Sequence, residues 1–157
     1  MIITKKLINE AIELAKPIVQ AFLTAEGFTW GPKYVIGFVS TPWTGLIPFD
    51  FVAPGETKEW NPVWGEEKDF ANIAMKKLEL TLRIGKNTSV VTADTPWLIR
   101  DGEYLYPGGV TQEGISVAIS GAKGRTDEAL AEILISIIIM LANLEADGRK
   151  KAGEMQI

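Results

Sequence analysis

The sequence YPGGVTQEGISVAISGAKGRTDEALA, residues 106–131, decides the fold of this chain. It contains a Gly-Gly turn, an apolar run, a second glycine-rich turn and a pair of acidic residues. An apolar run of this length between turn residues is typical of a buried strand, which we place at 115–120. Thr126 and the acidic pair favour a helix start, because a hydroxyl caps the first amides and carboxylates complement the helix dipole. The stretch therefore predicts a core strand followed directly by a last helix at 127–145.

Two further helices are predicted from apolar residues that recur at intervals of three and four. The first is an amphipathic opening helix at 4–23, and the second runs over 66–84. Gly85 follows the second helix at the position where a left-handed residue commonly ends a helix. The pattern therefore places one helix before and one helix after a region of strands and loops.

Short runs of aliphatic and aromatic residues predict the remaining strands. The runs at 33–40 and 46–53 are separated by a turn sequence and predict a β-hairpin. Pro48 lacks a backbone donor, which favours an edge position for the second strand of this hairpin. An Asp-Gly pair between apolar flanks at 97–106 predicts a second hairpin.

The composition indicates one globular domain over residues 1–157, with a polar C-terminal tail at 146–157. Hydrophobic residues make up 46% of the chain and charged residues 23%, as in ordinary globular proteins. The net charge of -4 provides no basic surface for phosphates, so we expect neither nucleic acid nor a membrane as a partner. The N-terminus lacks the pattern of a signal peptide, which favours a cytoplasmic location.

The chain contains neither cysteine nor histidine. Without cysteine there are no disulfides and no thiolate metal sites. Without histidine the chain lacks the commonest metal ligand and the commonest general base near neutral pH, and we expect no metal site. An enzyme would need a carboxylate or Lys77 as its base, so catalysis is the weaker expectation.

The segment at 133–142, ILISIIIMLA, is apolar on every side of the last helix. It falls well short of the roughly 20 residues that span a bilayer. One small domain cannot cover all sides of such a helix, so we expect a homo-oligomer formed through the helix at 127–145. The alternative is a helix that is buried wholly within one domain.

Two glycine turns are candidate ligand sites. The turn SGAKGRT at 120–126 joins a strand to a helix start, where free amides and two cations could hold an anion. The alternative is a simple turn in which Gly121 or Gly124 supplies a positive φ. The Pro-Gly-Gly turn at 107–109 either closes a hairpin or lets a ligand approach the backbone.

Aromatic residues are dense around the proline-rich loop at 54–65. Such residues either line a pocket for a flat apolar ligand or serve as core and interface anchors. The residues concerned are Trp43, Trp60, Trp64, Phe49, Phe51 and Phe70. Acidic residues at the start of the second helix suit the positive end of its dipole better than acid-base chemistry.

Several motifs occur in a fixed order along the chain. They are I-A-x-x-K in the second helix, P-G-G-V in the turn, V-x-x-S-G at the end of the core strand, and D-E-x-x-A at the last helix start. In this order they resemble the GlcG-like family, which includes haem-binding proteins of the HbpS type and the C-terminal domains of PduO-type proteins. The matching residues are Ile73, Ala74, Lys77, Gly85, Thr88, Ser89, Pro107 to Val110, Val117, Ser120, Gly121, Asp127, Glu128 and Ala131.

The resemblance implies an α+β, profilin-like fold of three α/β/α layers, with a five-stranded antiparallel sheet flanked by helices. It also implies homo-oligomers and ligand binding, with haem or a corrinoid as the ligand in some members. Because this chain lacks histidine and cysteine, a bound tetrapyrrole would have either no axial ligand or an unusual one. The available ligands are Tyr34, Tyr104, Tyr106, Met75 and the lysines.

We therefore expect a non-catalytic domain that binds a small molecule, either a small organic acid or a tetrapyrrole. The site is expected in a crevice between the second helix, the turn at 107–110 and the loop at 121–126. Its residues would be Lys77, Pro107, Gly108, Gly109, Gly121 and Arg125, with Lys77 and Arg125 as the anion partners. Two alternatives stay open, namely an assembly subunit without a ligand and an enzyme that uses a carboxylate or lysine base.

Overall fold

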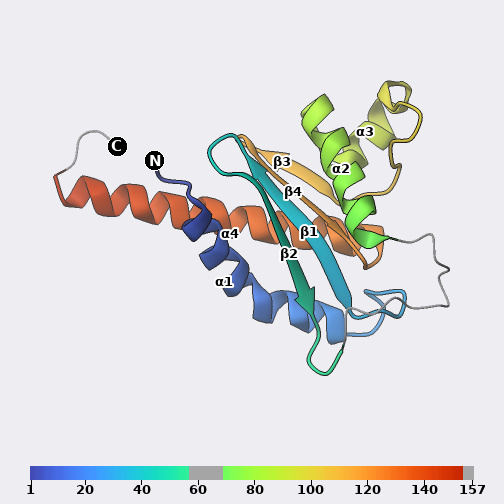
Figure 1. Cartoon of the computed structure of the whole chain (residues 1–157), viewed down its shortest axis with the longest axis horizontal. Helices are drawn as coiled ribbons and strands as arrows, with labels where there is room; N and C mark the ends of the chain where they lie inside the picture. Colours follow the sequence, from blue (N-terminus) through green and yellow to red (C-terminus); the bar gives the residue numbers. More distant parts are fainter. Residues whose placement is uncertain (57–68, 154–157) are drawn as a thin grey trace.

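The computed structural model describes residues 1–56 and 69–153, which form an α+β fold (Figure 1). The elements in chain order are α1 (Lys5–Thr24), β1 (Tyr34–Thr41), β2 (Gly45–Val52), α2 (Phe70–Ile84), α3 (Thr88–Asp94), the short 3-10 helix η2 (Pro96–Leu98), β3 (Gly109–Gln112), β4 (Ile115–Ser120) and α4 (Gly124–Lys151).

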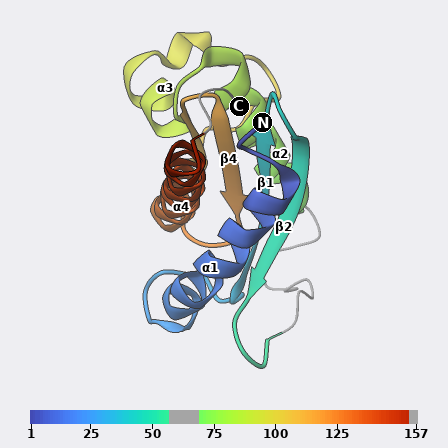
Figure 2. The same ribbon diagram turned by 90° about the vertical axis from the view of Figure 1, so that its left-hand side faces the viewer.

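The strands of the described residues form one antiparallel sheet in the order β2-β1-β4-β3. The central strands β1 and β4 pair with Phe38 opposite Ala118. Strand β2 lies at the edge of the sheet, which confirms the position predicted from Pro48. Helices α1 and α4 cover one face of the sheet and α2 covers the other (Figures 1 and 2). The three-layer arrangement is therefore the expected one.

The main hydrophobic core lies between the sheet and the pair of helices α1 and α4. Side chains alternate along β4, so Val117 and Ile119 belong to this core while Ser120 lies on the α2 face. Helix α4 completes the core with the fully buried side chains of Leu130, Leu134 and Ile138. The face that holds Ser120 is the more polar one, and it carries the site described below.

The expectation of five strands is wrong for the described residues, which contain four. The second hairpin, predicted at 97–106, is not formed there: its start is η2, and a turn without flanking strands follows. Arg83 at the end of α2 explains the difference. Its guanidinium donates to the backbone oxygen of Leu98 (2.7 Å) and to the Glu103 carboxylate (3.0 Å). The segment folds around this guanidinium and does not pair with a strand.

The ends of the helices differ from the predictions in ways that have local causes. Helix α2 begins at Phe70, where Asp69 accepts from the Asn72 amide (3.1 Å), and residues 66–68 of the predicted helix lie outside the described residues. Gly85 ends α2 with φ 76°, as predicted.

Helix α4 begins earlier and ends later than predicted. It starts at Gly124, so Thr126 lies inside the helix and is not its cap. The Asp127 carboxylate accepts from the Ala122 amide (3.0 Å), which precedes the helix, and this hydrogen bond holds the start of α4. It continues through the segment predicted as a polar tail, as far as Lys151. Basic side chains in its last turn favour this extension, since they complement the negative end of the helix dipole.

Among the described helices, α4 is long and apolar enough to cross a membrane, by length and composition only. The argument that the apolar segment is too short applies to residues 133–142 and not to a helix of 28 residues. The first half of α4 packs on the sheet, and its C-terminal part continues past the ends of the strands (Figure 1). Only 28% of its most apolar 18-residue window is buried, so much of its apolar surface is uncovered in the isolated chain.

Candidate functional site

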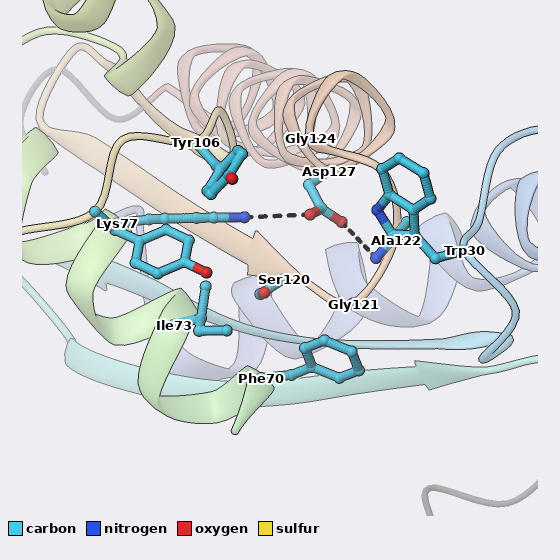
Figure 3. Close-up of a pocket in the computed structure, with 11 residues that line it drawn as sticks. Trp30, Phe70, Ile73, Lys77, Tyr106, Ser120, Gly121, Ala122, Gly124 and Asp127 are labelled. Carbon is cyan, nitrogen blue, oxygen red and sulfur yellow. Dashed lines mark hydrogen bonds and ion pairs between the residues drawn. The ribbon is translucent and has the colours of Figure 1, made fainter. Parts of the chain in front are cut away.

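A pocket of about 370 Å³ lies between α2, the segment at 104–106 and the turn that joins β4 to α4 (Figure 3). Four aromatic residues line it, and they come from three different segments of the chain. Its lining also includes Ile73 of α2 and the backbone of the β4–α4 turn. The aromatic residues are Trp30, Phe70, Tyr104 and Tyr106. The pocket lies against α2 and the β4–α4 turn, as the sequence predicted, but its third side is the segment at 104–106 and not the turn at 107–110.

A buried ion pair forms one side of the pocket. Lys77 lies on the buried face of α2, and its Nζ is 3.2 Å from Asp127 Oδ2, with both side chains only 2% exposed (Figure 3). The Lys77 ammonium also donates to the backbone oxygen of Ile119 (2.9 Å). The second oxygen of Asp127 accepts from the Ala122 amide (3.0 Å). The pair therefore ties α2, β4 and the start of α4 together.

Burial changes the protonation behaviour of both partners. Removal from water disfavours each charge, so it lowers the pKa of Lys77, and the neighbouring Asp127 carboxylate opposes this effect. Burial raises the pKa of Asp127 to about 7, against the opposing effects of Lys77 and the Ala122 amide. The pair carries no net charge when both are ionised, and its acid member titrates close to neutral pH.

Gly108 and Gly109 allow the backbone to pack directly on Lys77. Gly108 has φ 136°, and a Cβ there would lie 2.8 Å from Lys77 Nζ and 2.6 Å from the Ile119 oxygen. A Cβ on Gly109 would lie 2.7 Å from the Lys77 backbone oxygen. The Gly109 amide donates to the Thr88 hydroxyl (3.1 Å). The close approach expected at this turn is thus made to α2 and α3 of the protein itself.

Gly121 is part of the pocket and has φ 131°, which confirms that a glycine of the β4–α4 turn holds a positive φ. A Cβ there would lie 2.5 Å from the Tyr34 backbone oxygen, so a side chain would separate the turn from β1. Gly124 is already helical, and a Cβ there would lie 3.0 Å from Cδ of Pro107. The turn keeps its shape through these two contacts.

Of the six predicted site residues, Lys77 and Gly121 line the pocket, whereas Gly108 and Gly109 pack against Lys77 without lining it. Pro107 and Arg125 line a neighbouring hollow of about 560 Å³ with Phe28 and Lys123, and neither lines the pocket itself. The Arg125 side chain is 84% exposed and lies 4.0 Å from Glu128. Lys77 and Arg125 therefore do not form the expected pair of anion partners. The structure brings Lys77, Gly108 and Gly121 together.

Sequence reasoning missed Asp127 as the partner of Lys77, although a signal was present. Asp127 precedes Leu130, Ala131 and Leu134 at the spacing of a buried helical stripe, and Lys77 lies in a similar stripe of α2. Opposite charges on two buried stripes indicate a buried pair, because a single buried charge is costly.

The predicted aromatic cluster contributes little to the pocket. Of its members in the described residues, Phe70 lines the pocket, Phe49 and Phe51 belong to the main core, and Trp43 lies near the N-terminus and α4. Trp60 and Trp64 lie outside the described residues. The pocket aromatics Trp30, Tyr104 and Tyr106 come from other segments.

The residues of the pocket do not fit a haem that is held through its iron. Residues 1–56 and 69–153 contain no group of three acidic, histidine or cysteine side chains placed to hold a metal. Of the tyrosines considered as iron ligands, Tyr104 and Tyr106 line the pocket. Burial raises the pKa of Tyr104, which disfavours the phenolate that would bind iron. Lys77, the nearest cation for a propionate, is already paired with Asp127.

Comparison with solved structures found chains of similar fold. No protein-family model and no curated protein matches the sequence. The fold is similar to the crystal structure of Klebsiella pneumoniae protein ORFY, family-model DUF336, with a TM-score of 0.49 and 15% sequence identity. The match covers 82% of this chain and 88% of that one. DUF336 is the GlcG-like family. A similarity at this level does not establish that this chain belongs to it.

Proposed function

We propose that this chain is a GlcG-like domain that binds a planar organic acid, without catalysis, in the pocket between α2 and the start of α4. The observation that carries the proposal is an aromatic-lined pocket with a buried Lys77–Asp127 pair on one side. The order of the sequence motifs and the three-layer α+β fold support the family part of the proposal.

The aromatic lining favours a flat ligand. Faces and edges of aromatic rings stack on planar groups, and most small-molecule sites combine such a lining with a few polar groups. A volume of about 370 Å³ suits a ligand of one or two fused rings. A complete tetrapyrrole is much larger, so we favour the organic acid of the two ligand classes that the sequence suggested.

Lys77 is the polar group that would recognise the acid. An ammonium has three N–H groups, and the contacts among the described residues use two of them, to Ile119 and Asp127. The third can donate to a ligand oxygen. Protonation of Asp127, whose pKa is about 7, would leave the Lys77 charge to a ligand carboxylate. Acid binding would then take up a proton, and the affinity would fall as the pH rises from 6 to 8.

A binding function agrees better with this geometry than a catalytic one. Lys77 is 2% exposed and held by two acceptors, which restrains it from acting as a nucleophile or a mobile base. Asp127 is held in the same way by Lys77 and the Ala122 amide. These restraints suit a fixed recognition group whose position does not change when the ligand binds.

Calorimetric titration with 2-naphthoate and its neutral analogue 2-naphthamide tests the proposal. We expect naphthoate to bind more tightly, with an affinity that falls between pH 6 and 8 and with net proton uptake in buffers of different ionisation enthalpy. Naphthamide should show no such pH dependence. Phe70→Ala should weaken naphthoate binding about tenfold, since one stacked ring contributes about 0.5–1.5 kcal/mol beyond its buried area.

Trp97→Ala is the matched control, because Trp97 is 75% exposed and lies outside the pocket. It should bind naphthoate as the parent does. Equal affinities of the Phe70 and Trp97 variants would remove the pocket from consideration. A tight, saturable complex with haemin and a sharp Soret band would instead contradict our choice of ligand class.

A further inference from the structure

The outward side of α4 carries a stripe of exposed residues with helical spacing. The stripe runs along one side of the helix because its members recur at intervals of three and four residues, with Ile139 and Met140 side by side in its middle. We call it the outer stripe. Its members are Glu132, Ser136, Ile139, Met140, Asn143, Asp147 and Lys150. All are exposed except Ile139, which is partly buried.

The middle of the outer stripe is hollow and apolar. A depression of about 390 Å³ lies there between the end of β3 and α4. Gln112 of β3 borders it, together with Ser136, Ile139 and Asn143 of α4. The large apolar side chains beside it are uncovered, with Met140 50% and Leu144 60% exposed. Such a hollow can receive a side chain of similar size from another molecule.

The two ends of the outer stripe carry opposite charges. Glu132 and Lys150 are eighteen residues apart, which is about five helical turns and about 27 Å, so they lie on the same line along α4. Neither forms an ion pair with another described residue. A two-fold axis across the helix between them would bring each acidic end onto the basic end of a second copy. The stripe is therefore complementary to itself, as an isologous interface requires.

A second copy of the chain fits this surface better than a lipid bilayer does. The opposite side of α4 carries Asp127, Leu130 and Leu134, which are buried against the rest of the domain. Moving α4 into a membrane would remove these side chains from the core and leave Lys77 without its counter-charge.

We propose that two copies of this chain associate through the outer stripe of α4, with the two helices antiparallel and their two-fold axis near residue 141. Glu132 of each copy then lies beside Lys150 of the other, and Met140 enters the hollow near Asn143 of the other copy. Asp147 comes level with Ser136 of the second copy. This inference is independent of the proposed ligand, since the pocket lies at the opposite end of α4.

Charge reversal tests both the interface and the direction of the helices. Sedimentation velocity at 1–100 µM should show a dimer for the parent protein. Glu132→Lys or Lys150→Glu alone should each raise the dimer dissociation constant about tenfold or more, because two pairs per dimer become repulsive. The double variant that exchanges the two charges should recover the parent value within about threefold. In a parallel arrangement each of these residues would face its own copy, so the single reversals would only exchange one like-charge pair for another and would not weaken the dimer.

Glu13→Lys is the matched control, because Glu13 is exposed on α1 and carries the same charge. It should dimerise as the parent does, and circular dichroism should show the same helix content in every variant. A parent protein that stays monomeric throughout this range would overturn the proposal. So would a dimer that neither single reversal weakens, or a monomer that binds to neutral phosphatidylcholine vesicles through α4.

Discussion

Both halves of α4 carry large apolar side chains, but these side chains have different surroundings. The first half, 124–138, carries the paired Asp127 and the fully buried Leu130 and Leu134. In the second half, 139–151, the side chain of Met140 is 50% exposed and that of Leu144 is 60% exposed. A helix of 28 residues is about 42 Å long, whereas strands of eight residues reach about 26 Å. The core cannot cover the whole helix, so position along the sheet decides burial.

The largest expected effect is at the buried pair in the first half of α4. Asp127→Ala should lower the free energy of unfolding by about 3–5 kcal/mol, because it leaves the Lys77 charge buried without a partner. Glu145→Ala breaks the exposed pair with Arg149 in the second half and should cost less than about 1 kcal/mol. Urea denaturation measures both values, and equal losses would contradict the difference between the two halves.

A double substitution separates the charge from the packing at this pair. Lys77→Met with Asp127→Leu should recover most of the stability that Asp127→Ala loses, because no charge is then left buried alone. If the double variant loses as much stability as Asp127→Ala does, the hydrogen bond from the Ala122 amide to Asp127, and not the ion pair, stabilises this end of α4.

Gly108→Ala should be the next largest effect, at about 2–3 kcal/mol. Its φ of 136° disfavours any side chain, and the new Cβ would meet Lys77 and the Ile119 oxygen. Gly102→Ala also adds a side chain at a positive φ, but nothing lies within 4 Å of its Cβ, so it should cost only about 1 kcal/mol. Thermal melting compares the two. Equal melting temperatures would show that packing against Lys77 does not limit this turn.

The buried pair should also give the stability a distinct pH dependence, of up to about 4 kcal/mol. The pKa of Asp127 is about 7 when folded and 3.8 ordinarily, so between these values the folded state binds a proton that the unfolded chain has lost. Stability contributed by Asp127 therefore falls as the pH rises from about 4 to about 7. The lowered pKa of Lys77 has the opposite effect at higher pH. Between this lowered pKa and the ordinary pKa of 10.5, the unfolded chain binds a proton that the folded state has lost, so stability rises with pH there.

Urea unfolding between pH 4.5 and 7.5 measures the lower window. The parent should lose stability relative to the Lys77→Met and Asp127→Leu double variant as the pH rises, because the other carboxylates are common to both proteins. Identical slopes would show that Asp127 keeps an ordinary pKa in the folded state.

The smallest effect on the fold is expected in the second half of α4. Met140→Asp should change the stability of the monomer by less than about 1 kcal/mol, since the side chain is half exposed. The same substitution should abolish association at micromolar concentration, because it places a charge in the apolar hollow beside Asn143. Leu134→Asp should instead prevent folding. Unchanged association of the Met140 variant would move the interface elsewhere.

Much of the fold could be predicted from local patterns. The opening helix, the first hairpin with Pro48 at an edge, the core strand β4 and the end of α2 at Gly85 all follow from periodicity and turn chemistry. These elements were predictable because each depends on neighbours within a few residues of the chain. The prediction of the second hairpin was wrong because the shape of that segment depends on a residue distant in sequence. An Asp-Gly pair favours a hairpin locally, but Arg83, distant in sequence, binds Glu103 and Leu98 and holds the segment in another shape.

The site shows the same division. The sequence alone indicated Lys77 and Gly121 as residues of the site, but it expected the turn at 107–110 where the segment at 104–106 lines the pocket. Only the tertiary structure pairs Lys77 with Asp127 and moves Arg125 to a different hollow. Periodicity gives the side of a helix that is buried, but the partner of a buried charge depends on how two helices meet across a sheet. That meeting, between α2 and the start of α4 over β4, is decided by packing of the whole chain.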